Sequence, residues 1–249
     1  MTQPHHTTLA TQHIMDSLTG MTLGMEVFIR LINQQGHTHG PCPVRLKGQW
    51  ADIDRHVAQT LLSLTQGGFL DYFSGFVSLN LASETLADKA KMDRLLPVYG
   101  QLNDALVGGL VVETSESADE FDIERHWQAL GRSARFIALD DYGKARSTPE
   151  RLTRFDWHIC KADTPRVLED TRYSDPLRDH HFVVVENIET RQEARRCLQE
   201  GFEAQQGYWH HKPLALPPLI MEGREMVIHV PKTPPLLDAT LTGGVYAVD

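Results

Sequence analysis

The sequence lacks any apolar run long enough to cross a membrane, and its first stretch, MTQPHHTTLATQHIMDS, lacks the apolar core of a signal peptide. Cysteine is scarce: Cys42, Cys160 and Cys197 are an odd number of thiols without metal-ligand spacing. Basic charge is in deficit, with 24 lysines and arginines against 33 aspartates and glutamates. These absences predict a cytoplasmic protein with reduced thiols, no membrane association and no DNA binding.

Internal repeats, low-complexity blocks and proline-rich or glycine-rich linkers are also missing. Of the 249 residues, 41% are hydrophobic and 23% are charged, which is typical of a globular protein. We therefore expect a single barrel domain over residues 19–249, because barrels of this length are commonly one domain. Residues 1–18 are interpreted as an N-terminal tail or a short lead-in helix.

Short apolar runs alternate with stretches of helical periodicity. Helices are predicted at 51–64, where Ile53, Val57, Leu61 and Leu64 share one face, and at 122–130 and 189–201. Such alternation favours parallel β/α units, and over more than 200 residues it favours a (β/α)8 barrel. Strands are predicted at 25–32, 76–81, 108–113, 136–140, 156–161, 181–186 and 202–205.

Polar residues recur where these strands end, and the carboxyl ends of barrel strands meet at one mouth. Any one of them is more often a plain strand-end polar residue, but their occurrence on nearly every strand argues for a shared site. Oxygen-rich sites suit Mg²⁺ or Mn²⁺, and two such ions suit phosphoryl chemistry. The residues are Glu26, Asn80, Glu113, Asp140 with Asp141, Lys161, Glu186 and Gln206.

Two of these residues need a special explanation. Glu26 lies near the start of its predicted strand, so it reaches the mouth only if that strand is antiparallel to the others. Asp140 and Asp141 are adjacent carboxylates after an apolar run, and such a pair is costly to bury unless cations neutralise it.

Six segments in order resemble the motifs of the EAL-domain cyclic di-GMP phosphodiesterases. GMEVFIR resembles the E-A-L-x-R segment, VSLNLAS resembles S-V-N-L-S, and LVVETSES resembles L-x-x-E-I-T-E-S. IALDDYG is similar to I-A-L-D-D-F-G, and CKAD to the K-I-D strand. VVVENIETRQEARRCLQEGFEAQQGYWHHKPL follows V-A-E-G-V-E-T and then Q-G-Y. Each match alone is weak, but six at compatible spacings are a specific signal.

The resemblance implies a TIM-barrel-like (β/α)8 fold with one antiparallel strand. It also implies hydrolysis of cyclic di-GMP to linear pGpG with two Mg²⁺ or Mn²⁺ ions per site, and a homodimer as a candidate assembly. The implied metal ligands are Glu26, Asn80, Glu113, Asp140, Asp141 and Glu186, with Asp140 bridging the two ions.

Further roles follow from the resemblance position by position. Lys161 would contact the attacking water, and Glu189 would support the site from nearby. Glu116 would anchor the loop that follows the aspartate pair. On the substrate side, the implied contacts are Arg30 with a phosphate, Gln206 on the pocket floor and Phe28 near a guanine.

Several positions depart from the motifs of this family. Phe28 replaces the leucine of the name motif, and Asn187 replaces a glycine between the late glutamates. In the loop at 142–148, Lys144, Ala145 and Arg146 replace Thr-Gly-Tyr, so one glycine hinge is lost. The connection from Lys161 to Glu186 is also shorter than is usual, which implies a truncated or rebuilt helix there.

Three functions therefore remain open. The complete set of ligand types together with Lys161 favours an active cyclic di-GMP phosphodiesterase. The altered loop and the shortened connection favour a weak or inactive EAL-like domain that acts as a cyclic di-GMP receptor or protein-interaction module. The third alternative is another barrel metallohydrolase, which the motif matches disfavour.

Overall fold

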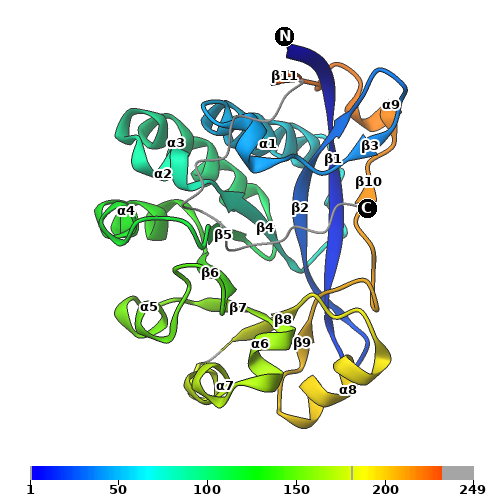
Figure 1. Cartoon of the computed structure of the whole chain (residues 1–249). Coiled ribbons are helices and arrows are strands. Elements are labelled where there is room, and N and C mark those ends of the chain that lie inside the picture. The colour runs from blue at the N-terminus through cyan, green and yellow to red at the C-terminus, as the bar shows by residue number, and fades with distance from the viewer. Residues whose placement is uncertain (1, 181, 232–249) are drawn as a thin grey trace.

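The computed structural model describes residues 2–180 and 182–231 (Figure 1). It confirms the predicted mixed α/β fold, a closed eight-stranded barrel in which β1 pairs antiparallel with both β2 and β9 and the other neighbouring strands are parallel. The barrel strands are β1 Thr2–Asp16, β2 Thr22–Ile32, β4 Phe76–Leu81, β5 Leu110–Thr114, β6 Phe136–Tyr142, β7 Ile159–Asp163, β8 Val183–Glu186 and β9 Ala204–Gln205.

The antiparallel strand β1 corrects two expectations. Residues 2–16 form a strand and not a tail or helix, since they pair with β2 from His6 opposite Ile32 to Met15 opposite Thr22. Glu26 does not need an antiparallel strand, because β2 already begins at Thr22 and runs parallel to β4. Figure 1 shows β1 and β2 as a long pair of neighbouring strands in blue.

Apolar side chains form two layers, one inside the barrel and one between the barrel and its helices. The inner layer, which includes Phe76, Val111 and Val184, fills the barrel interior. The outer layer takes the alternate strand residues, such as Val77 and Leu79, because successive strand side chains point to opposite faces. The polar mouth therefore rests on an apolar floor.

The three predicted helices are present as α1, α4 and α8, and several helices have clear reasons to begin where they do. In α1, the predicted apolar face of Ile53, Val57, Leu61 and Leu64 is buried. Thr190 and Glu193 form a capping box at the start of α8. The main helices are α1 Trp50–Gln66, α2 Ser83–Ala87, α3 Lys89–Ala105, α4 Glu120–Ser133, α5 Pro149–Arg154 and α8 Arg191–Gln199.

Two short helices, α6 Thr164–Glu169 and α7 Thr171–Leu177, fill the shortened connection between Lys161 and Glu186. They are separated at Asp170, whose carboxylate accepts the backbone N–H of Arg172 and so starts α7. The rebuilt connection predicted from the sequence is thus confirmed. The strand predicted at 181–186 is β8, although His181 itself lies outside the described residues.

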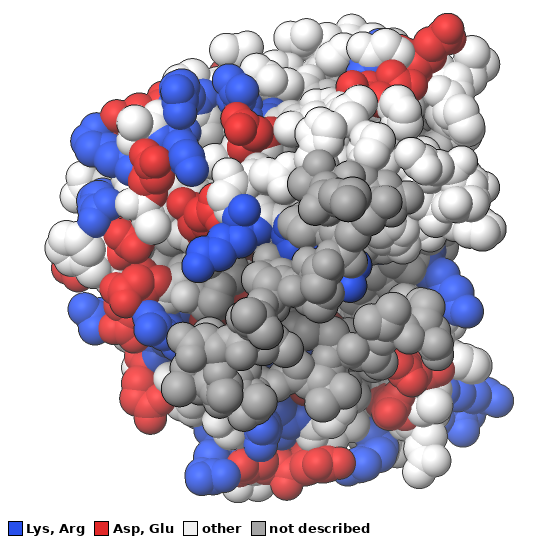
Figure 2. Space-filling view, turned by 45° about the horizontal axis from the view of Figure 1, so that its top comes forward, with Lys and Arg blue, Asp and Glu red and all other residues white. Residues whose placement is uncertain are grey.

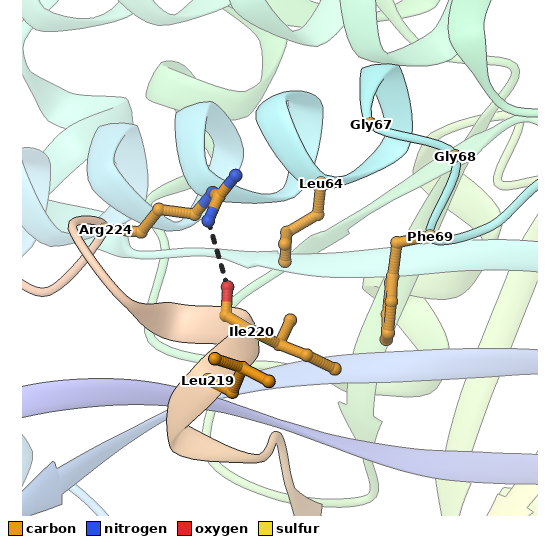
Figure 3. Close-up of a pocket in the computed structure, with 7 residues that line it drawn as sticks. All are labelled: Leu64, Gly67, Gly68, Phe69, Leu219, Ile220 and Arg224. Carbon is orange, nitrogen blue, oxygen red and sulfur yellow. Dashed lines mark hydrogen bonds between the residues drawn. The ribbon is translucent and has the colours of Figure 1, made fainter.

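The last described segments cover the edge of β1. They comprise β10 Leu214–Ala215, α9 Pro218–Met221 and β11 Val227–Pro231, while β3 Thr38–His39 and the 3-10 turn η1 Pro43–Leu46 follow β2. Figure 3 shows Leu219 and Ile220 of α9 across an open pocket of about 290 Å³ from Leu64 and Phe69. Arg224 donates to the Ile220 carbonyl at its rim. None of the predicted site residues lines this pocket.

The charged surface is mixed in sign. On the face shown in Figure 2, lysines and arginines are interleaved with aspartates and glutamates at the left of the view. Within residues 2–180 and 182–231, no helix is long and apolar enough to cross a membrane.

Candidate metal centre

The strands place the polar side chains by simple alternation. On five of the parallel strands, the inward position two residues beyond an apolar side chain of the inner layer is polar, and on β4 the polar Asn80 lies four residues beyond Phe76. Asn80 lies opposite Glu113, whereas Glu113 lies opposite Ala138 and Lys161 opposite Val184, so the polar positions are staggered along the strands. They gather because the carboxyl ends of barrel strands meet at one mouth. The pairs are Phe76 with Asn80, Val111 with Glu113, Ala138 with Asp140, Ile159 with Lys161, Val184 with Glu186, and Ala204 with Gln206.

Lys161 lies at the centre of this cluster, with its side chain only 2% exposed. Its Nζ lies 2.8 Å from Glu26 Oε2, 2.7 Å from Glu113 Oε2 and 2.8 Å from Glu186 Oε1. Asp140 Oδ1 lies slightly farther away, at 3.4 Å. Carboxylates from β2, β5, β6 and β8 thus converge on one ammonium group from β7.

Two amide side chains hold Glu26 in place. Asn80 Nδ2 donates to Glu26 Oε1 at 2.6 Å, and Gln206 Nε2 donates to Glu26 Oε2 at 2.9 Å. Burial opposes ionisation of Glu26, but Lys161 and these donors outweigh it, so the pKa of Glu26 lies below its ordinary value. Glu26 is therefore held in its charged form by one ammonium and two amide donors together.

The remaining carboxylates are short of positive charge. Burial, reinforced by the neighbouring carboxylates, raises the pKa of Glu113 and of Glu186 well above the ordinary value, and that of Asp140 to about 7. Burial lowers the pKa of Lys161, but its carboxylate partners raise it well above the ordinary value, so the ammonium stays charged. Among the described residues, Glu113 Oε1 is buried without a hydrogen-bond partner.

This donor set fits hard divalent cations such as Mg²⁺ or Mn²⁺. The atoms that could coordinate a metal ion are carboxylate and amide oxygens, and negative charge exceeds positive charge within the cluster. In the part of the chain that the structure describes, no group of three or more His, Cys, Asp or Glu side chains is arranged to hold a metal ion. The carboxylates instead close around Lys161 Nζ, which takes the place at their centre.

Asp141 is separated from this cluster by an irregularity of β6. Four residues of β6, from Leu139 to Tyr142, lie opposite three residues of β7, from Cys160 to Ala162, so the aspartate pair occupies a bulge. Asp141 has a positive φ of 49°, which turns its side chain away from regular alternation. Its Oδ1 lies 2.7 Å from Lys144 Nζ.

Two predicted catalytic residues lie outside the cluster. Glu189 is exposed, and its backbone N–H donates to the Glu193 carboxylate at 2.9 Å. The Glu116 carboxylate accepts from the Ser115 hydroxyl, while its carbonyl accepts the backbone N–H of Arg146 at 3.3 Å. The Glu116 backbone thus touches the loop after the aspartate pair, whereas the roles of both carboxylates remain predictions.

The predicted substrate contacts on β2 share a face with Glu26. Phe28 and Arg30 follow Glu26 at intervals of two residues, so all three side chains point to the same side of the strand. Arg30 lies over the Phe28 ring, with its Cζ 4.8 Å from the centroid, and its Nη1 donates to the Ile29 carbonyl. Both side chains are half-buried beside the mouth.

Gln206 owes its position to the glycine that follows it. Gly207 has a φ of 156°, and a Cβ there would lie 2.2 Å from the Ile188 carbonyl oxygen. This close approach allows the Ile188 N–H to donate to the Gln206 carbonyl and the Trp209 N–H to donate to Ile188. The Q-G-Y segment is thus a tight backbone contact between the chain after β9 and the loop after β8.

Two residues of the mouth, Gln12 and Asp163, were not predicted from the sequence. Gln12 of β1 accepts from Gln206 Nε2 at 3.2 Å, and Asp163 at the end of β7 accepts from Asn187 Nδ2 at 3.0 Å. The signal for Asp163 was present, because it lies two residues after Lys161 within CKAD. Gln12 could have been found only by recognising β1 as a strand.

Comparison with known proteins supports the fold. No protein-family model matches the chain, and no curated protein matches it significantly. Among solved structures, the EAL enzyme Bd1971 with cAMP and cyclic di-GMP bound aligns with a TM-score of 0.69 at 18% identity, covering 87% of this chain. The chain spans 64% of the length of Bd1971, which is less than two thirds.

Two further solved structures are similar. The PaMucR phosphodiesterase in complex with c-di-GMP has a TM-score of 0.68 at 18% identity, with 84% of this chain and 92% of that chain covered. The manganese and cyclic di-GMP complex of Klebsiella pneumoniae BlrP1 at pH 9.0 has a TM-score of 0.59 at 20% identity. The alignment covers 92% of this chain and 62% of the BlrP1 chain. The chain therefore has the EAL-type barrel fold that its motifs predict.

Proposed function

We propose that this protein is a metal-dependent phosphodiesterase that hydrolyses cyclic di-GMP to linear pGpG. The observation that carries the proposal is the convergence of Glu26, Glu113, Asp140 and Glu186, from four separate strands, around Lys161 at the barrel mouth. An excess of carboxylates in one buried place is costly unless cations are bound there. Two of the similar solved structures are complexes with cyclic di-GMP, one of them also with manganese, which supports the same choice.

In the proposed reaction, the oxygen of a water molecule forms a bond to phosphorus, the bond from phosphorus to a ribose 3′ oxygen breaks, and that oxygen takes up a proton. When bound, two divalent cations would lower the pKa of the attacking water and offset charge on the phosphate. Glu26, Glu113, Asp140, Asp141 and Glu186 would hold them, with the Asn80 side chain.

The cationic side chains have distinct parts in this proposal. Lys161 remains charged because its pKa is raised, so it acts as a hydrogen-bond donor to the water or the phosphate and not as a base. Arg30 would pair with the second phosphate from β2, where Phe28 supports its guanidinium. Gln206 would form the floor beside Glu26.

The test is to incubate the purified full chain with cyclic di-GMP and Mg²⁺ or Mn²⁺ and to separate the products by chromatography. Linear pGpG should form, and Asp140→Asn should abolish it. The matched control is Asp93→Asn, an exposed aspartate paired with Lys89 on α3, which should keep full activity. Undiminished turnover in Asp140→Asn, or turnover in excess EDTA, would refute the proposal.

A second candidate function is a cyclic di-GMP receptor of the same fold with little turnover. The observation that favours it is the contact between Lys144 and Asp141, which engages one of the proposed metal ligands. Calorimetric binding of cyclic di-GMP without product formation would favour the receptor over the enzyme.

A further inference from the structure

Two lysines divide the carboxylates of the mouth between them. Lys161 contacts Glu26, Glu113, Asp140 and Glu186. Lys144 contacts a different pair, Asp141 Oδ1 at 2.7 Å and Asp163 Oδ1 at 3.0 Å. The two sets share no member, so the side of the mouth around Asp141 has an ammonium of its own.

The loop that carries Lys144 is closed by its own backbone. The Lys144 N–H donates to the Asp141 carbonyl at 2.9 Å, and the Ser147 N–H donates to the Lys144 carbonyl at 2.8 Å. Ser147 is fully buried, and its hydroxyl donates to the Asp140 carbonyl at 2.7 Å. The Lys144 backbone is therefore fixed beside the aspartate pair.

The far partner of Lys144 is fixed as well. Asp163 Oδ1 also accepts from Asn187 Nδ2 at 3.0 Å, and its side chain is only 16% exposed. Asn187 adopts a φ of 59°, a left-handed conformation that asparagine tolerates better than most residues. The Lys144 ammonium thus lies between two carboxylates whose positions are fixed. Its contacts with them offset the conformational entropy that an exposed lysine side chain would gain on release.

A cation at this place competes with a divalent ion for Asp141. The second ion of the proposed centre would use Asp140, Asp141 and Glu186. With the Asp141 carboxylate neutralised by Lys144, that ion loses one charged ligand and meets a like charge within a few ångströms.

We propose that Lys144 is a resident cation that substitutes for the second divalent ion, so that this chain binds one divalent ion tightly at its mouth where the proposed function assigns two. The inference rests on the proposed function, since it concerns the same centre. It predicts that lysine at position 144, where the family motif has threonine, lowers the number of divalent ions that bind and does not impair folding.

The experiment counts bound Mn²⁺ on the full chain by titration calorimetry and by equilibrium dialysis with elemental analysis. Wild type should bind one ion tightly. Lys144→Thr should bind two, with affinity for the second raised about tenfold or more by removal of the like charge. Lys144→Arg retains the cation and should bind one, and the matched control Lys89→Thr, an exposed ion-paired lysine, should also bind one.

The outcomes separate this inference from the proposed function. Two tightly bound ions in wild type, or one in Lys144→Thr, would overturn the inference and leave the phosphodiesterase proposal standing. No bound Mn²⁺ in wild type or in Lys144→Thr would overturn both. A thermal unfolding scan of each variant in EDTA establishes that the proteins compared are folded.

Discussion

Lys144 and Asn187 contact the same atom, Oδ1 of Asp163, each at 3.0 Å. Both are positions where the sequence departs from the motifs that it otherwise resembles. They come from the loops after β6 and β8, and Asp163 ends the strand between them, β7. Two substitutions far apart in sequence thus form one connected set of contacts beside the mouth.

This shared contact predicts coupling between the two residues. Each single variant, Lys144→Thr or Asn187→Gly, leaves Asp163 with one donor, whereas the double variant removes both. The double variant should therefore lose more free energy of unfolding than the sum of the single variants, by about 0.5 kcal/mol or more. Urea unfolding of the four proteins measures this, and strict additivity would contradict the coupling.

Lys161 is expected to carry two separable roles. In EDTA, Lys161→Ala should lower the melting temperature strongly, because several buried carboxylates lose the ammonium group that they contact. Saturating Mn²⁺ should recover much of that loss, since bound ions stabilise the folded state. Lys89→Ala, an exposed control, should show neither effect.

With metal present, the same Lys161→Ala variant should lose turnover while binding of cyclic di-GMP survives. A donor that acts on the attacking water or the phosphate contributes in the transition state more than in the ground state. Steady-state kinetics and calorimetric affinity measure the two quantities. Equal losses of binding and turnover would count against this role.

Asp54 on α1 predicts a pH dependence that is independent of the metal centre. Burial raises the pKa of Asp54 from 3.8 to about 7, although Thr85 and the Ala82 N–H donate to it. Between these values the folded protein holds a proton that the unfolded chain releases, so this carboxyl makes stability fall as pH rises from about 4 to about 7.

Asp54→Asn should remove that component. The free energy of unfolding of wild type minus that of Asp54→Asn should fall steadily from about pH 4 to about pH 7 and level off above about pH 7. Urea titration at several pH values measures this difference. Thr85→Val keeps the carboxyl but removes a donor to its charged form, so the fall in stability should extend to higher pH than in wild type. A flat difference curve would show that Asp54 is not protonated at neutral pH.

Ala145 stores backbone strain in the loop after β6. Its φ of 41° lies in the left-handed region, which costs a residue with a Cβ about 1 kcal/mol. Ala145→Gly should therefore be neutral or stabilising, because relief of strain offsets the added freedom of the unfolded chain. Ala129→Gly within α4 should destabilise by about 1 kcal/mol. Thermal unfolding compares them, and a clear loss in Ala145→Gly would contradict the assignment.

Short apolar runs separated by helical stretches were enough to predict most barrel strands. In β4, apolar Phe76 and polar Asn80 lie on the inward face while Val77 and Leu79 face the helices, and the same order recurs in β5 to β8. Since side-chain direction follows from backbone geometry alone, the residues that meet at the mouth could be predicted without coordinates. The motif resemblance then supplied the fold type, which the structure confirms.

Strand β1 could not be predicted in this way. Its segment is rich in threonine, histidine and glutamine, and such residues are buried only where partners satisfy them. Gln12 finds those partners in Gln206 and the His211 carbonyl, almost 200 residues away. Barrel closure, a property of the whole chain, therefore decides that this polar segment is a strand.

Strand periodicity and residue type are local properties, so the order of residues was enough to identify which side chains of the mouth carry charge and which strand ends present them. How that charge is shared depends on the closed barrel: Lys161 pairs with the four inner carboxylates, and Lys144 with Asp141 and Asp163. Pairing between ions depends on distance, and loops from separate strands set that distance once the barrel is closed.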